Sequence, residues 1–155
     1  MAKTLYMETT KISAANTVAD IQKFLVASGA KSILIEYDEK TKHPSAIKFK
    51  LIVNNQEMHF ALPARSEPIF NYISKNRSPL NRNKKQFIDK DKQQAERTAW
   101  RQILRWVEAQ FALIHTGMVA TEEVFMPYVI TNTGQTLFEA FKEHKLNLLT
   151  EGIEE

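Results

Sequence analysis

Three arginines on one predicted helix are the residues of this chain best suited to bind phosphate groups. Arg97, Arg101 and Arg105 recur at steps of four within a long segment that contains no Gly and no Pro. In an α-helix each step of four turns about 40° around the axis, so the three side chains follow one another along one side. Guanidinium groups pair with phosphate oxygens through charge-assisted hydrogen bonds. The spacing therefore predicts an arginine ridge that binds a polyanion.

Two tryptophans on the same helix favour contact with nucleobases. Binders of single-stranded nucleic acid combine cations along the backbone with flat side chains on which bases stack. Trp100 and Trp106 lie six residues apart, about 240° around the helix axis, so they cannot both face the core squarely. We expect one of them to be exposed, with Trp100 stacking on a base or supporting the ridge. The alternative is that both tryptophans anchor the core or a subunit interface.

Further cations belong to the predicted nucleic-acid surface. Residues 65–105 carry 11 Lys and Arg against 4 Asp and Glu, whereas residues 106–155 carry 2 against 8. A concentrated positive segment of this kind attracts polyanions, although the whole chain is only +3. Besides the helix residues, the predicted contacts are Lys48, Lys50, Arg77, Arg82, Lys84 and Lys85. The alternative is a solvated loop beside an ordinary charged helix.

No set of residues for catalysis or metal binding can be assembled from the sequence. The four histidines are isolated, cysteine is absent, and with only 4 Gly the chain lacks the motifs that cradle phosphates. Glu36, Asp38 and Lys40 have a spacing close to that of a metal-dependent nuclease, but they fall in a turn where these residue types are common. We therefore expect a protein that is not an enzyme and that uses no cofactor and no metal.

Helical periodicity predicts helices on both sides of residues 31–62. Apolar spacing predicts a first helix over 13–28 and a long helix over 89–115, and a short helix opens at Ser66. Between the last two, residues 75–92 are polar and basic, which predicts a mobile loop. C-terminal helices follow, one of them opened by a capping-box spacing before residue 137, and residues 147–155 are expected to fray.

Alternating apolar residues predict three consecutive strands between the first two helices. The strands are expected at 31–37, 46–53 and 58–62, with Asn54 and Asn55 forming the tight turn of a hairpin. Short links make this arrangement an antiparallel meander, apolar on the side that helices cover. The fold class predicted from this order is α+β.

Length and composition bound the remaining properties. At 155 residues, with 43% hydrophobic and 25% charged residues, the chain is expected to form a single domain over 1–155 with a packed core. The absence of cysteine is compatible with a reducing compartment. Neither a signal peptide nor a run of 18 apolar residues is visible, so we expect no membrane segment and a cytoplasmic location.

Four short motifs resemble an uncharacterised family of bacteriophage and prophage proteins. They are Ala99-Trp100-Arg101, Trp106-Val107-Glu108-Ala109-Gln110, Phe125-Met126-Pro127-Tyr128 and Thr136-Leu137-Phe138-Glu139. This resemblance implies a phage origin, and hence the cytoplasm of the host cell. The order of a β-meander, a basic loop and a long helix is also similar, more loosely, to the RecT and Red-beta class of phage single-strand annealing proteins.

These observations lead to a first functional hypothesis and two alternatives. We expect a homo-oligomeric DNA-binding protein, preferring single strands, that acts in phage recombination or replication. The first alternative is a phage anti-defence protein that sequesters a signalling nucleotide or binds a host protein, with its arginines clamping phosphates in a closed pocket. The second is an assembly subunit whose tryptophans lie at subunit contacts.

Overall fold

The computed structural model describes residues 4–144 of the chain. A three-stranded antiparallel sheet and six α-helices form the described part, which confirms the predicted α+β class. In chain order the elements are α1 (Ala14–Ala27), β1 (Ser32–Tyr37), β2 (Pro44–Val53), β3 (Gln56–Pro63), α2 (Glu67–Lys75), α3 (Pro79–Arg82), α4 (Lys85–His115), α5 (Thr121–Phe125), the short 3-10 helix η1 (Met126–Tyr128) and α6 (Leu137–Glu143).

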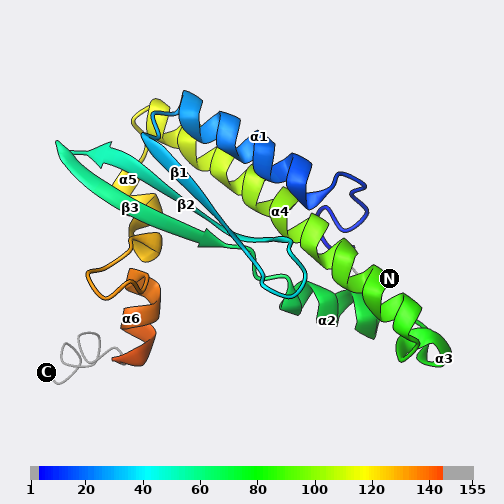
Figure 1. The fold of residues 1–155 in the computed structure, drawn as a ribbon. Helices are drawn as coiled ribbons and strands as arrows, with labels where there is room; N and C mark the ends of the chain where they lie inside the picture. Colours follow the sequence, from blue (N-terminus) through cyan, green and yellow to red (C-terminus); the bar gives the residue numbers. More distant parts are fainter. Residues whose placement is uncertain (1–3, 145–155) are drawn as a thin grey trace, which may run out of the picture.

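The sheet is the predicted meander, with the strands in the order β1-β2-β3 (Figure 1). Asn54 and Asn55 form the β2–β3 turn with φ of 50° and 63°, the left-handed geometry that asparagine tolerates in a tight hairpin. Residues at every second position of β2 are buried on one face of the sheet, where Phe49 stacks on Phe60 of β3 at 5.3 Å between ring centroids. This face contributes the sheet's half of the core.

Helices α1 and α4 run side by side along the sheet (Figure 1). α1 begins where Ser13 Oγ accepts a hydrogen bond from the Asn16 N–H at 3.1 Å, and it is followed by Gly29 with φ of 105°. Its core-facing side meets α4 through an edge contact between Phe24 and Phe111, whose centroids are 5.8 Å apart. Fully buried aromatic rings of α4, β3 and α5 fill the centre of this core.

The prediction that residues 75–92 form a loop is wrong. The structure places helix α3 in this segment, and α4 begins at Lys85, four residues before the predicted start. The reason is a pair of contacts between residues distant in the sequence: Arg77 binds Asp91 fourteen residues away, and its guanidinium lies 4.6 Å from the ring centroid of Phe87. These contacts fold a locally polar segment back onto α4.

The C-terminal part pairs with the edge strand β3 and continues as α6. Ile130 N–H bonds to the His59 carbonyl of β3 at 2.8 Å, which anchors the segment between η1 and α6. The predicted capping box opens α6, because Thr136 Oγ1 accepts from the Glu139 N–H while Glu139 accepts from the Thr136 N–H. The expected frayed tail at 147–155 lies outside the described residues. Within 4–144, no helix is both long enough and apolar enough to cross a membrane.

Candidate nucleic-acid interface

Arg101, the central member of the predicted arginine ridge, is buried and cannot reach a phosphate. It is 6% exposed and lies beneath α1. Thr98, three residues earlier, is buried on the same side of α4. Its Nη1 is 3.4 Å from Thr17 Oγ1 and 3.5 Å from Asp20 Oδ2 of α1, and its Nε is buried without a partner in the described chain. Arg101 therefore belongs to the interface between the two helices.

The two flanking arginines have different surroundings, so the prediction of one continuous ridge is wrong. Arg97 is half-buried, and its Nε and Nη2 donate to Gln94 Oε1 at 3.1 and 2.6 Å. Gln94 in turn donates to the carbonyls of Glu8 and Thr10, which fastens the N-terminal segment to α4. Arg105 is exposed and forms an ion pair with Glu108, one turn later, at 3.0 Å. An exposed pair of this kind is worth at most about 1 kcal/mol, so Arg105 remains able to bind a ligand.

Trp100 is a core residue, and the prediction that it stacks on a base is wrong. Its side chain is fully buried, and the indole N–H donates to the Pro44 carbonyl at 3.3 Å. Packing a large ring and satisfying its N–H in the interior is the ordinary structural use of tryptophan. Trp106 is half-buried, with its ring held edge-on against Phe125 and Tyr128. Of the two tryptophans, Trp106 keeps an accessible face.

The hairpin lysines lie on the outer face of the sheet, as predicted, but carboxylates neutralise both of them. Lys48 Nζ is 2.5 Å from Glu36 Oε1 on β1, and Lys50 Nζ is 3.3 Å from Glu57 Oε1 on β3. Each pair joins neighbouring strands across the sheet and adds a modest cross-strand contact. The two lysine side chains are 33% and 23% exposed, against 44% for Arg105, so these ion pairs leave them less accessible to a ligand than Arg105.

Arg77 and Arg82 are both committed to the corner between α2, α3 and α4. Arg77 holds the carboxylate of Asp91 in a two-pronged contact, with Nε 3.0 Å from Oδ2 and Nη2 bonded to Oδ1. Asp91 is 3% exposed, and its hydrogen bonds raise the pKa of Arg77 above the ordinary value. Arg82 Nη2 donates to the carbonyls of Lys75 and Arg77 at 2.9 and 3.3 Å. These arginines shape the corner and have little freedom to bind a ligand.

The cations that remain available at this corner are lysines. They are exposed, they form no ion pair within residues 4–144, and they are Lys75, Lys84, Lys85, Lys90 and Lys92. We call residues 75–92 the basic end, because α3 and the first turns of α4 form one extremity of the molecule (Figure 1). It holds seven Lys and Arg against two Asp, a net +5, whereas the other described residues hold twelve against thirteen, a net −1.

The sequence predicts only some of the available lysines of the basic end. Lys84 and Lys85 were predicted and are present at the basic end. Lys75, Lys90 and Lys92 were not singled out, although they belong to the positive segment that the charge distribution revealed. Lys92 Nζ lies 5.9 Å from the ring centroid of Phe70 on α2, so it is oriented over that helix.

The start of α4 is electrostatically unfavourable on its own. Lys84 occupies the N-cap position without any capping hydrogen bond from its side chain, and Lys85 is the first helical residue. The first turn contains no acidic residue. The N-terminus of a helix carries partial positive charge from its dipole, so two lysines there destabilise the helix where Asp or Glu would stabilise it. A bound anion would relieve this repulsion.

The possible nuclease trio is a turn. Asp38 Oδ1 accepts the backbone N–H groups of Lys40 and Thr41 at 2.9 and 2.8 Å, and these bonds, that of Thr41 first, lower the pKa of Asp38 below its ordinary value. Glu36 is paired with Lys48. Among the described residues, no three His, Asp or Glu side chains are grouped so that they could hold a metal ion.

Comparisons of the chain with family models, with curated proteins and with solved structures found no match, so the resemblance to a phage family stays a prediction.

Proposed function

We propose that this protein binds nucleic acid through the basic end and contacts the phosphate backbone. The observation that carries the proposal is the start of α4, where two lysines without an ion pair in residues 4–144 stand at a positively polarised helix terminus that has no capping side chain and no acidic residue in its first turn. Such an arrangement lowers stability in the free protein. It becomes favourable when phosphates lie beside it, because the lysines and the helix dipole then act with the same sign.

The surroundings of these two lysines support a polyanion of several phosphates. Lys75, Lys90 and Lys92 extend the positive surface along α2 and the next turns of α4, and the nearby carboxylate of Asp91 is engaged by Arg77. DNA remains our prediction for the strand, with a role in phage recombination or replication. Because Trp100 is buried, it does not support a preference for single strands, and the test must include both strand types. A homo-oligomer would align several basic ends along one strand.

Fluorescence anisotropy of labelled single- and double-stranded oligonucleotides at several salt concentrations tests the proposal. If the five lysines each contact a phosphate, the slope of log affinity against log salt is about −3.5 for single strands and about −4.5 for double strands. Replacing Lys84 and Lys85 together by glutamine reduces the slope by about 1.4 for single strands, since two phosphate contacts are lost.

The matched control replaces two exposed lysines away from the basic end, one in the second half of α1 and one between α1 and β1. Lys23 and Lys31 form no ion pair within residues 4–144, and their change to glutamine alters the net charge equally. This control variant should keep the slope of the unaltered protein within about 0.5, well under the change expected for the Lys84 and Lys85 variant. A flat salt response, or equal losses in the two double variants, would exclude binding through the basic end.

A further inference from the structure

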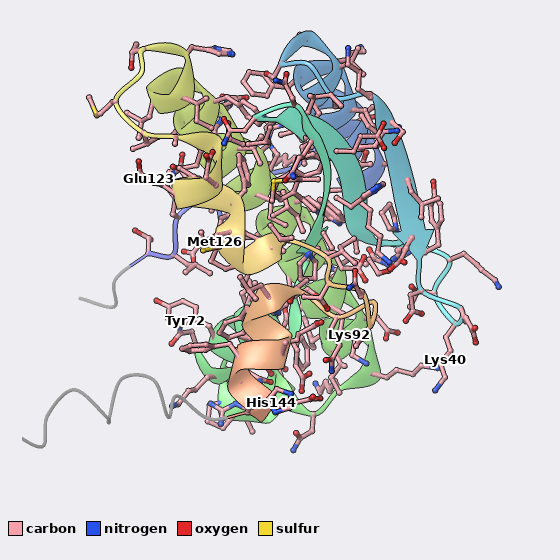
Figure 2. All side chains as sticks on the ribbon, turned by 90° about the vertical axis from the view of Figure 1, so that its left-hand side faces the viewer. Lys40, Tyr72, Lys92, Glu123, Met126 and His144 are labelled. Atoms are coloured by element: carbon pink, nitrogen blue, oxygen red, sulfur yellow. The ribbon has the colours of Figure 1, made fainter. Side chains whose placement is uncertain are left out.

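A large cavity lies away from the basic end, against the middle of α4. Its volume is about 710 Å³, within the size range of small-ligand sites, and it is broadly open to solvent. It is bounded by the end of β3, the first turn of α2, residues 99–106 of α4, and η1. In Figure 2, η1 beside Met126 and α2 beside Tyr72 lie in the left-hand half of the view, away from the sheet.

Two arginines give this cavity a positive charge that no lining carboxylate balances. Arg65 follows β3, is exposed, and has no carboxylate partner among residues 4–144; its guanidinium lies 5.7 Å from the ring centroid of Phe138. Arg105 comes from α4, and its ion-pair partner among residues 4–144 is Glu108 at the surface. None of the residues that line the cavity is Asp or Glu. An anionic group is therefore the charge complement of the site.

An aromatic surface with a free donor adjoins these arginines. Trp106 lines the cavity, and its ring plane is fixed by edge contacts with Phe125 and Tyr128, each 5.5 Å between centroids. Its indole N–H has no acceptor within the described chain. Ile69 and Ile103 add apolar surface beside it. A rigid indole with apolar neighbours and an unused N–H suits a flat, heteroatom-bearing ring.

We propose that this cavity binds a nucleoside phosphate, with the base against Trp106 and the phosphate between Arg65 and Arg105. A ring joined to an anion matches both halves of the lining, whereas inorganic phosphate or a neutral ring matches only one. The same chemistry is offered by a free nucleotide and by the phosphorylated end of a strand. The site is separate from the basic end, so the proposal stands or falls independently of the proposed function.

Calorimetric titration with AMP, adenosine and inorganic phosphate tests the proposal on the full chain. AMP should bind with a Kd below about 1 mM and at least about tenfold more tightly than either fragment. Arg65→Gln and Arg105→Gln should each weaken AMP binding about tenfold or more, since each removes a charge-assisted contact. Both arginines are exposed, so the variants should keep the thermal stability of the unaltered protein. AMP should also quench tryptophan emission, because a base stacks on Trp106 and Trp100 is shielded.

Matched variants separate this site from the basic end. Lys40→Gln removes one charge from the β1–β2 loop, where Figure 2 shows Lys40 pointing outward, and should leave AMP binding unchanged. The Lys84 and Lys85 double variant should also bind AMP normally. Comparing a 5′-phosphorylated oligonucleotide with its unphosphorylated form tells whether a strand end also enters the cavity. Equal affinity for AMP and adenosine, equal affinity for AMP and inorganic phosphate, or no AMP binding up to about 1 mM would overturn the proposal.

Discussion

Replacing Arg77 by methionine should destabilise the fold instead of merely weakening binding. Arg77 is the partner that compensates the carboxylate of Asp91, which is 3% exposed. Removing one member of a fully buried pair costs about 3–5 kcal/mol, because the other charge is left without compensation. The Arg77 side chain is itself 27% exposed, so water can partly replace it, and we expect a loss of about 2–3 kcal/mol. For a chain of this size that corresponds to a fall in Tm of roughly 5–10 °C.

Urea unfolding followed by circular dichroism measures this loss, and a double-mutant cycle identifies its cause. Arg77→Met combined with Asp91→Leu removes both charges and should recover at least about half of the lost stability, because the stranded carboxylate is gone. The nearby control Lys75→Gln, at an exposed lysine with no ion pair to any described residue, should change stability by less than about 0.5 kcal/mol. If Arg77→Met matched that control, or if the double variant were no more stable than Arg77→Met, the buried carboxylate would not be the source of the effect.

Three further predictions concern the core, a helix start and a turn. Trp100→Phe should cost about 2 kcal/mol in urea unfolding, because it leaves a cavity and an unpaired carbonyl, yet oligonucleotide affinity should not change. Thr136→Ala should cost about 1 kcal/mol, and hydrogen exchange at the Glu139 amide should become faster as the capping box is lost. The pKa of Asp38 followed by NMR should lie below its ordinary value of 3.8, since the Thr41 and Lys40 N–H groups favour the carboxylate. Its contribution to stability is therefore present above pH 3.8 and lost as the pH falls through the lower folded-state pKa, and Asp38→Asn should remove this dependence.

The fold could be predicted where local sequence and tertiary packing agree. Ser13 and Gly29 stand at the two ends of α1, and Asn54 and Asn55 adopt the left-handed turn that their side chains tolerate. These features depend on neighbours within a few residues, so a single sequence contains them. The segment 75–92 is different, because its helices are stabilised by contacts that close over fourteen residues. Local composition shows a mostly polar segment with a proline and few apolar residues, and it says nothing about such a closure.

The proposed binding surface is harder to predict because a charge does not reveal its partner. Lys48 and Lys50 alternate correctly along β2, yet the carboxylates that neutralise them come from the adjacent strands. The net charge of residues 65–105 indicates the positive end of the molecule, because net charge is a sum that needs no knowledge of the contacts. Choosing the available cations within it required knowing that Arg77 engages Asp91 and that Arg82 engages backbone carbonyls.

The spacing of the arginines also explains why they separate on α4. Each step of four residues turns the side chain by about 40° around the helix axis, so Arg105 points about 80° away from Arg97. Neighbours cover α4 on several sides, so three arginines spread over this angle do not all reach the same exposed face. Helix α1 and the sheet cover one part of α4 and α2 covers another, so Arg101 falls beneath α1 while Arg105 emerges at the cavity. The exposed lysines escape this constraint because the first turns of α4 extend past α1 and the sheet (Figure 1). The geometry of helix coverage thus divides one basic segment into two surfaces, one that suits a phosphate backbone and one that suits a nucleoside phosphate.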